Sequence, residues 1–339
     1  MQKEIIEKGN LHREKGVLNE IGWSRNLLLD YDRKLVKAPG FLIKEWDYYA
    51  VLNDKFGVAL TIADNGYLGF ISATFFDFSV PEEHTKTIMT VMPLGKFKMP
   101  GTSERGNVTY ENKEVTIDFI KEDEQRILKF SIKNFHENKS FTGDVILHQP
   151  RDMESITIVT PFTKKNRFYY NQKINCMKAS GKITFNDREY DFENNESYGV
   201  LDWGRGVWTY ENTWYWSSAS GKLNGELFGF NLGYGFGDTS SATENAVFYQ
   251  GKVNKLGHVE FIIPEDSYLD NWKITSDDHR IELMFEPVID RNSSTKVLFL
   301  GSDQHQVFGY FSGKIILDDF REILLDRFFG FAEKVFNKW

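Results

Sequence analysis

The chain has 339 residues, 41% hydrophobic and 27% charged, which excludes a disordered chain, collagen, a coiled coil and a disulfide miniprotein. Its length indicates about two domains. Forty-one basic against 49 acidic residues give a net charge of −8, which argues against nucleic acid as a partner because phosphate binding needs clustered basic residues. The unusual values are 15% aromatic residues and 27 glycines.

The cysteine content and the apolar runs bear on the compartment. Cys176 is the single cysteine, so no internal disulfide is expected, and the start Met-Gln-Lys-Glu-Ile lacks the order of a signal peptide. The longest apolar runs fall far below the ~18 residues of a membrane span. We therefore expect a cytoplasmic protein with no transmembrane segment, of unknown oligomeric state.

Most of the sequence alternates with period two and is interrupted about every ten residues by Gly, Asn-Asp or Pro, which is typical of antiparallel strands in a meander. Two segments contain a turn, at Asn186-Asp187 and at Asp318-Asp319, and predict hairpins. The strand-like segments are 48–56, 115–120, 127–132, 182–192, 298–300 and 314–325.

The C-terminus has a different spacing. A recurrence of three to four residues predicts a short amphipathic helix there. The residues that recur are Phe328, Phe331 or Ala332, Val335 and Trp339.

A weak internal repeat relates the two halves of the chain. Ser180-Gly181-Lys182-Ile183 returns as Ser312-Gly313-Lys314-Ile315, and the pentad 198–202 (Tyr-Gly-Val-Leu-Asp) returns as 329–333 (Phe-Gly-Phe-Ala-Glu). Chance matching of hairpin composition is the alternative. Otherwise the chain consists of two related all-β domains, 1–200 and 201–339, each with enough strands to close into a barrel.

The segment 202–220 holds four of the eight tryptophans. If 207–218 is extended, alternate side chains form an aromatic face. That face consists of Trp208, Tyr210, Asn212, Trp214 and Trp216.

A second aromatic strand is predicted over 227–238. Aromatic and apolar residues alternate there with Asn231 and four glycines, and glycine in a strand marks a bend or the close approach of a ligand or another backbone. Two interpretations remain open: the aromatic faces form a solid core, or one of them borders a cavity for a large apolar ligand. The polar stretch 238–246 that follows makes a turn or carries function, and Glu244 and Asn245 are its functional candidates.

These motifs resemble those of the bacterial, functionally uncharacterised DUF2804 family. The matching strings cover nearly the whole chain: 45–49, 170–173, 201–208, 214–216, 229–238, 243–245, 303–309 (with His305) and 330–334. That family is in turn similar to the carotenoid 1,2-hydratase and AttH-like group. This resemblance implies two tandem lipocalin-like, or calycin-type, antiparallel β-barrels. The hydratases carry an acid in a Tyr-x-Asp-x-x-Trp-Gly motif on an aromatic-lined cavity, and Tyr198 with Asp202-Trp203-Gly204 is its loose counterpart here.

An acid among Trp and Tyr side chains is desolvated, which raises its pKa and suits a general acid. Asp202 could then protonate an alkene, and the carbocation would be attracted to the tryptophan faces. The alternative is an ion pair between Asp202 and the nearby Arg205, which would disable the acid.

The leading hypothesis is binding of a hydrophobic small molecule, of lipid or isoprenoid type, in an aromatic-lined cavity. The alternatives are a cofactor-independent hydratase, isomerase or cyclase, and a structural or interaction protein with solid barrels. No metal site and no cofactor are expected, because no nucleotide or metal motif is present. The predicted catalytic residues are Asp202 and Glu244, and the predicted ligand-binding residues are Tyr198, Arg205, Trp208, Tyr210, Trp214, Trp216, Asn231, Asn245 and His305.

Overall fold

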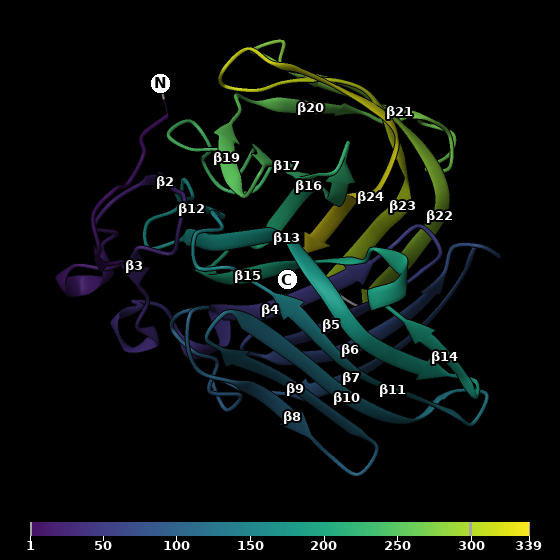
Figure 1. The fold of residues 1–339 in the computed structure, drawn as a ribbon. Helices are drawn as coiled ribbons and strands as arrows, with labels where there is room; N and C mark the ends of the chain where they lie inside the picture. The colour runs from purple at the N-terminus through teal and green to yellow at the C-terminus, as the bar shows by residue number, and fades with distance from the viewer. Residues whose placement is uncertain (1, 298–299, 339) are drawn as a thin grey trace.

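The computed structural model describes residues 2–297 and 300–338, and antiparallel strands make up most of it (Figure 1). The first, thirteen-stranded sheet contains β2 (Gly22–Ser24), β4 (Ile43–Leu52), β5 (Phe56–Asp64), β6 (Leu68–Asp77), β7 (Glu82–Val91), β8 (Val108–Glu111), β9 (Val115–Glu122), β10 (Gln125–His136), β11 (Lys139–His148), β12 (Ile156–Pro161), β13 (Phe168–Phe185), β14 (Arg188–Asp191) and β15 (Tyr198–Val207).

The second, nine-stranded sheet contains β16 (Glu211–Leu223), β17 (Glu226–Tyr234), β18 (Ala246–Tyr249), β19 (Lys252–Lys255), β20 (Val259–Ile262), β21 (Trp272–Ser276), β22 (Ile281–Val297), β23 (Leu300–Ile316) and β24 (Glu322–Lys338). The remaining elements are the parallel pair β1 (Gly9–Asn10) and β3 (Leu29–Asp30) and the 3-10 turns η1 (Glu14–Gly16), η2 (Arg33–Leu35), η3 (Gly40–Leu42) and η4 (Glu193–Asn195).

Each sheet is a meander whose last strand returns to its first: β15 pairs with β4, and β24 pairs with β16. The resulting curl is interrupted between β7 and β8 in the first sheet and between β19 and β20 in the second. At the first gap, Lys86 Nζ donates to the carbonyl oxygens of Lys133 (2.8 Å) and Asn134 (3.1 Å). The all-β fold of two tandem lipocalin-like units is therefore confirmed.

The inner face of each curled sheet encloses its own apolar core. Ile117, Trp203 and Tyr170 are fully buried in the first, and Trp272 and Phe285 in the second. Successive side chains of a strand point to opposite faces. The side chains that alternate with the core residues therefore lie on the outer face of each sheet.

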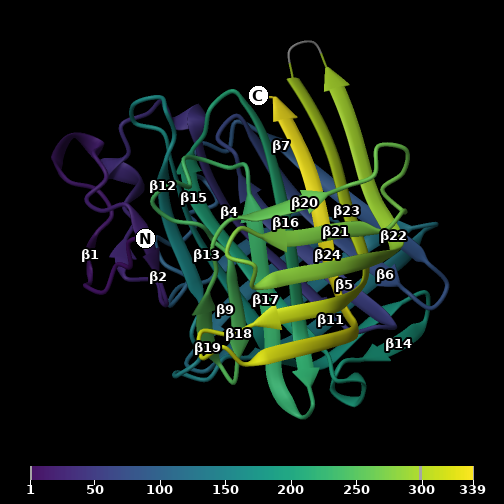
Figure 2. The same ribbon diagram turned by 90° about the horizontal axis from the view of Figure 1, so that it is seen from above.

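The second sheet lies on the outer face of the first, as both views show (Figures 1 and 2). Phe76 of β6 and Phe308 of β23 meet there with ring centroids 4.4 Å apart. Asn175 at a bulge in β13 donates to Ser218 Oγ (2.7 Å) in β16. A Cβ added at Gly229 of β17 would lie 2.5 Å from Cys176 Sγ. Glycine therefore permits this close approach, which is of another strand and not of a ligand.

The hairpins predicted at 186–187 and 318–319 are confirmed as the connections of β13 to β14 and of β23 to β24. Of the segment 298–300, residues 298 and 299 lie outside the described residues. The strand expected over 227–238 ends at Tyr234, because Gly235 (φ +90°) and Gly237 (φ +77°) turn the chain.

The predicted short C-terminal helix is wrong: residues 322–338 form β24, paired on both edges with β16 and β23. Both faces of this strand are covered, with Phe331 and Val335 on one face and Phe328 and Ala332 on the other. Because apolar residues occur on both faces, their spacing resembles that of an amphipathic helix. Trp339 is outside the described residues. The chain passes from the first sheet to the second between Val207 and Glu211, while a domain division at residue 200 stays a prediction.

The sequence repeat has a structural counterpart. Gly181 (φ +89°) and Gly313 (φ +138°) interrupt equivalent long strands, and an added Cβ at either would lie 2.2 Å from a carbonyl oxygen of the neighbouring strand. In the first unit, both β14 and β15 pair with β13. In the second unit, β24 alone pairs with the equivalent strand, β23. Asp202 and Glu333, the acids of the repeated pentads, thus occupy corresponding strands.

Gly181→Ala tests this constraint against Gly225→Ala, a hairpin glycine of similar φ (+87°) with nothing within 4 Å of an added Cβ. The positive φ alone should lower the unfolding free energy by about 1 kcal/mol at Gly225. The carbonyl clash should bring the loss at Gly181 to at least about 2 kcal/mol. Denaturant unfolding measures both, and equal losses would contradict the proposed crowding.

Candidate functional site

Four ionisable side chains meet between the two sheets, and we call them the carboxylate cluster: Lys173 (β13), Asp202 (β15), Glu244 (before β18) and Glu333 (β24). Lys173 Nζ lies 2.9 Å from Asp202 Oδ2 and 3.7 Å from Glu244 Oε2. All four residues are less than 10% exposed. Two carboxyl groups, those of Asp202 and Glu244, thus share one ammonium group, and the third acid, Glu333, is buried beside them.

Strand register brings these residues together. Lys173 and Asp202 are direct partners of β13 and β15, and Glu333 is the direct partner of Trp216 on β16. On all these strands the positions concerned belong to the outer face of their own sheet. Because the outer faces pack on each other, residues from both sheets point into one interface.

Asp202 is bound from within the first sheet. Besides the ion pair with Lys173, its Oδ1 accepts a hydrogen bond from Asn171 Nδ2 (2.5 Å). The alternative of an ion pair with Arg205 is wrong: three residues along a strand lead to the opposite face. Arg205 is buried inside the first sheet, where it contacts Asp47 Oδ1 (3.0 Å).

Glu333 is held by neutral donors. Its carboxyl oxygens accept hydrogen bonds from Trp214 Nε1 and Gln306 Nε2, both at 3.0 Å. Burial raises the pKa of Glu333 to about 7, with Asp202 adding a like charge. A carboxyl group of this kind holds or releases a proton near neutral pH.

Glu244 has partners on both sides. Burial raises its pKa, while the ammonium of Lys173 opposes the shift. Its Oε2 accepts a hydrogen bond from Asn231 Nδ2 (3.2 Å), and Asn231 Oδ1 accepts one from Trp216 Nε1 (2.7 Å). Gly233 leaves space for this carboxyl group, since an added Cβ would lie 2.6 Å from Glu244 Oε1.

Aromatic rings surround the carboxylate cluster. Lys173 Nζ lies 4.0 Å from the centroid of Trp216. Beside it, five rings that we call the aromatic box pack with centroids 4.7–6.2 Å apart: Trp46, Tyr169, Trp208, Trp214 and Phe236. Burial, followed by the charges of the three carboxyl groups, raises the pKa of Tyr169, so its hydroxyl keeps its proton beside the acids.

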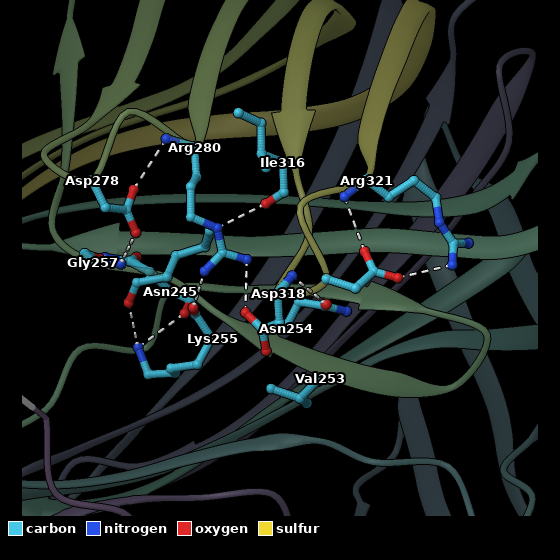
Figure 3. A network of polar contacts seen from close by, with 12 residues as sticks. Asn245, Val253, Asn254, Lys255, Gly257, Asp278, Arg280, Ile316, Asp318 and Arg321 are labelled. Carbon is cyan, nitrogen blue, oxygen red and sulfur yellow. Dashed lines mark hydrogen bonds and ion pairs between the residues drawn. The ribbon is translucent and has the colours of Figure 1, made fainter.

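Asn245 stands next to the cluster and holds the loop that carries Glu244. Its Oδ1 accepts from Gly233 N (2.6 Å), and its Nδ2 donates to Gly257 O (2.9 Å). Figure 3 shows the adjoining network, in which Lys255 Nζ donates to the carbonyl oxygen of Asn245 (3.0 Å) and Arg280 NH1 donates to that of Lys255 (2.8 Å). Asn245 therefore positions the loop.

Four of the predicted residues lie apart from the cluster, and Arg205, buried inside the first sheet, is one of them. Tyr198 is buried, with no hydrogen-bond partner for its hydroxyl among the described residues. Tyr210 precedes β16 and is 48% exposed. His305 lies on the opposite face of β23 from Gln306, where its Nδ1 is 2.7 Å from Asp290 Oδ2 and its ring stacks on Tyr268 at 3.7 Å.

The structure adds functional candidates that the sequence reasoning missed: Lys173, Glu333, Tyr48 and Gln306. Gln306 Nε2 lies 3.2 Å from the Tyr48 hydroxyl, which joins β4 to the cluster. The sequence did contain an indication of Glu333, because this residue is the acid of the second copy of the repeated pentad. For Lys173, the sequence contained no indication of its partner, since the pairing of β13 with β15 is tertiary.

Two surface pockets lie elsewhere on the molecule. One, of about 470 Å³, is lined by residues that include Tyr31, Pro100 and Arg105. Another, of about 310 Å³, is lined by residues that include Lys55, Arg188 and Tyr190. Neither includes a member of the carboxylate cluster.

Within residues 2–297 and 300–338, no three His, Cys, Asp or Glu side chains are placed to hold a metal ion. Over the same residues, no helix has the length and apolar character needed to cross a membrane.

The comparisons with known proteins agree with the fold. The model of a family described as "Domain of unknown function (DUF2804)" matches residues 2–339, and no curated protein sequence matches. Similar solved structures include a protein described as AttH from Nitrosomonas europaea (12% identity, TM-score 0.54, covering 90% of this chain and 96% of that one). Another is kievitone hydratase from Nectria haematococca (12% identity, TM-score 0.53, 98% of both chains). At this identity the likeness shows a shared fold.

Glu333→Gln tests the proton equilibrium of the cluster. Between the ordinary pKa of 4.5 and about 7, folded Glu333 keeps a proton that the unfolded chain releases. The wild-type protein should therefore lose stability as pH rises through this window, by an amount on the order of 1–3 kcal/mol. Urea unfolding from pH 4.5 to 8 should show a larger loss in the wild type than in Glu333→Gln, in which the raised pKa of Glu244 still contributes.

The matched control is Glu226→Gln, an exposed residue at the start of β17, which should follow the wild-type curve. Parallel pH profiles for the wild type and Glu333→Gln would contradict a raised pKa at Glu333.

Proposed function

The chain belongs to the DUF2804 family, and we propose that it binds a hydrophobic small molecule, of lipid or isoprenoid type, at the carboxylate cluster. The observation that carries the proposal is a group of three buried acids inside an aromatic interface, of which two share the ammonium group of Lys173 and the third, Glu333, is held by an indole and an amide. Burying unbalanced charge opposes folding, and such arrangements concentrate at functional sites. Apolar side chains alone would suffice to hold the two sheets together, so the buried acids are not needed for that purpose.

The aromatic box supplies the apolar contact surface. Trp46, Trp208 and Trp214 are half-buried, whereas the interiors of both sheets are filled by their own cores. We therefore place the ligand between the sheets and not inside either curl. The rings offer planar surface to an extended hydrocarbon, and the acids lie at its end.

Acid catalysis is the second function, favoured by the raised pKa of Glu333. Among the three acids, Glu333 is held by neutral donors, whereas protonation of Asp202 would give up its ion pair with Lys173. In a hydratase, the alkene π electrons take the proton of one carboxyl group and leave a carbocation. Water then adds to the cation and passes a proton to a second carboxylate, so the step balances with alkene and water alone.

The box and the excess negative charge suit this step. A carbocation is attracted to the faces of Trp208 and Trp214 and to the carboxylates. Internal capture of the same cation would give a cyclase, and loss of a proton an isomerase. The kievitone hydratase named above shares the fold with this chain, and its activity is consistent with the proposal without carrying it.

Ligand binding is tested by native mass spectrometry of freshly purified protein and by tryptophan fluorescence during titration with fatty acids, retinoids and polyprenols. A bound ligand should quench or shift the emission. Most of the change should disappear in Trp214→Phe and persist in Trp272→Phe, whose ring lies in the core of the second sheet. A panel without any spectral change, and no co-purified mass, would argue for solid barrels without a ligand.

Catalysis is tested by incubating any ligand so identified and measuring the gain of one water or a change of isomer. Glu333→Gln and Asp202→Asn should each lower turnover by about 10²–10⁴-fold while ligand affinity changes little. Glu226→Gln serves as the exposed control. Unchanged turnover in Glu333→Gln would exclude Glu333 as the acid and leave Asp202 or Glu244.

A further inference from the structure

A group of exposed apolar side chains lies at one end of the first sheet, on two adjacent segments, 33–42 and 89–98. Val91 is 80% exposed and Met89 is 65% exposed. We call the group the apolar patch, and its members are Leu35, Phe41, Met89, Val91, Met92 and Leu94.

Both segments pack against the turn between β5 and β6, where a Cβ added at Gly66 would lie 2.4 Å from Phe41 O of the first segment. Leu94 N donates to Gly66 O (3.2 Å) and Met92 N to Tyr67 O (2.9 Å), both in the turn between β5 and β6. A Cβ added at Gly40 would lie 3.9 Å from Leu94 Cδ2. The exposed apolar side chains therefore belong to one continuous region. The N-terminal loops, purple in Figure 1, lie at this end of the sheet.

The same two segments are basic. Lys34, Lys37, Lys96 and Lys98 are exposed, and none of them forms an ion pair with the described residues. Neither segment contains an acidic residue, and Arg33 is neutralised by Glu45. Asp32 and Asp64 accept backbone hydrogen bonds from Lys34 and Gly95, so the four free ammonium groups leave this region with an excess of positive charge on a chain of net charge −8.

We propose that this region docks the protein on an anionic lipid bilayer surface. Apolar side chains interspersed with lysines fit such a surface, because the apolar side chains enter the headgroup layer while the ammonium groups meet lipid phosphates and carboxylates. A protein partner of ordinary polarity would have to bury four lysines, which protein interfaces tend to exclude from their centres.

The apolar patch also lies near a strand that carries part of the aromatic box. Tyr67 O accepts a hydrogen bond from Met92 N (2.9 Å), and the centroid of the Tyr67 ring lies 4.2 Å from Lys44 Nζ in β4. Trp46 of the aromatic box follows Lys44 by two residues in the same strand. Docking would bring this end of β4 to the membrane. Membrane binding itself does not require the proposed ligand function, so the two can fail separately.

The test is co-sedimentation of the full chain with vesicles of phosphatidylcholine alone and of phosphatidylcholine with about 30% phosphatidylserine. Binding is expected only to the anionic vesicles and should weaken at high salt. The variant Lys34→Gln/Lys96→Gln/Lys98→Gln should bind roughly 100-fold more weakly. Met92→Ser/Leu94→Ser should also lose binding, without a change in the circular dichroism spectrum.

The matched control is Lys8→Gln/Lys164→Gln/Lys178→Gln, which removes the same charge from exposed lysines outside the two segments. It should bind like the wild type. Equal weakening in this control, or no binding to anionic vesicles, would overturn the proposal. So would a dimer, detected by light scattering, that the Met92→Ser/Leu94→Ser variant abolishes, because the patch would then bind a second copy of the chain.

Discussion

The packing of the two sheets through their outer faces is the constraint on which the site depends. A single curled sheet has an apolar interior and needs only a polar exterior, yet here part of each exterior is aromatic and buried. The contact is close because glycines of β17 face the first sheet. Gly229 accommodates Cys176, and Gly233 accommodates the Glu244 carboxyl group.

This interface combines large apolar area with charge that it does not neutralise. The rings exclude water, which strengthens each remaining electrostatic contact and makes every unpaired acid unfavourable. Lys173 compensates Asp202 and part of Glu244, while Glu333 relies on an indole and an amide. Burial disfavours the charged form of Glu333, and the like charge of Asp202 adds to this effect; these are the physical causes of its raised pKa.

Repetition of one unit explains how such a site arises. The corresponding acids of the two units, Asp202 and Glu333, stand on the strands that close each curl, and the stacking of the units brings both to one place. The aromatic box draws on both units, with Trp46 and Tyr169 from the first and Trp214 and Phe236 from the second, and β13 supplies the lysine. Neither unit alone contains the whole cluster, so ligand binding there would depend on the integrity of both.

The sequence by itself determined the all-β class, the tandem repeat and the concentration of aromatic residues near the start of the second unit, because period-two alternation and glycine-aromatic spacing are local properties. It also singled out Asp202 and Glu244. Only the tertiary structure decided their partners. Strand pairing decides that Asp202 contacts Lys173 and not Arg205. The burial of both faces of 322–338 decides that this segment is a strand and not a helix. Some of these contacts join residues more than a hundred positions apart, such as Trp214 and Glu333, and even Lys173 and Asp202 meet only because β13 pairs with β15, so no local pattern encodes them.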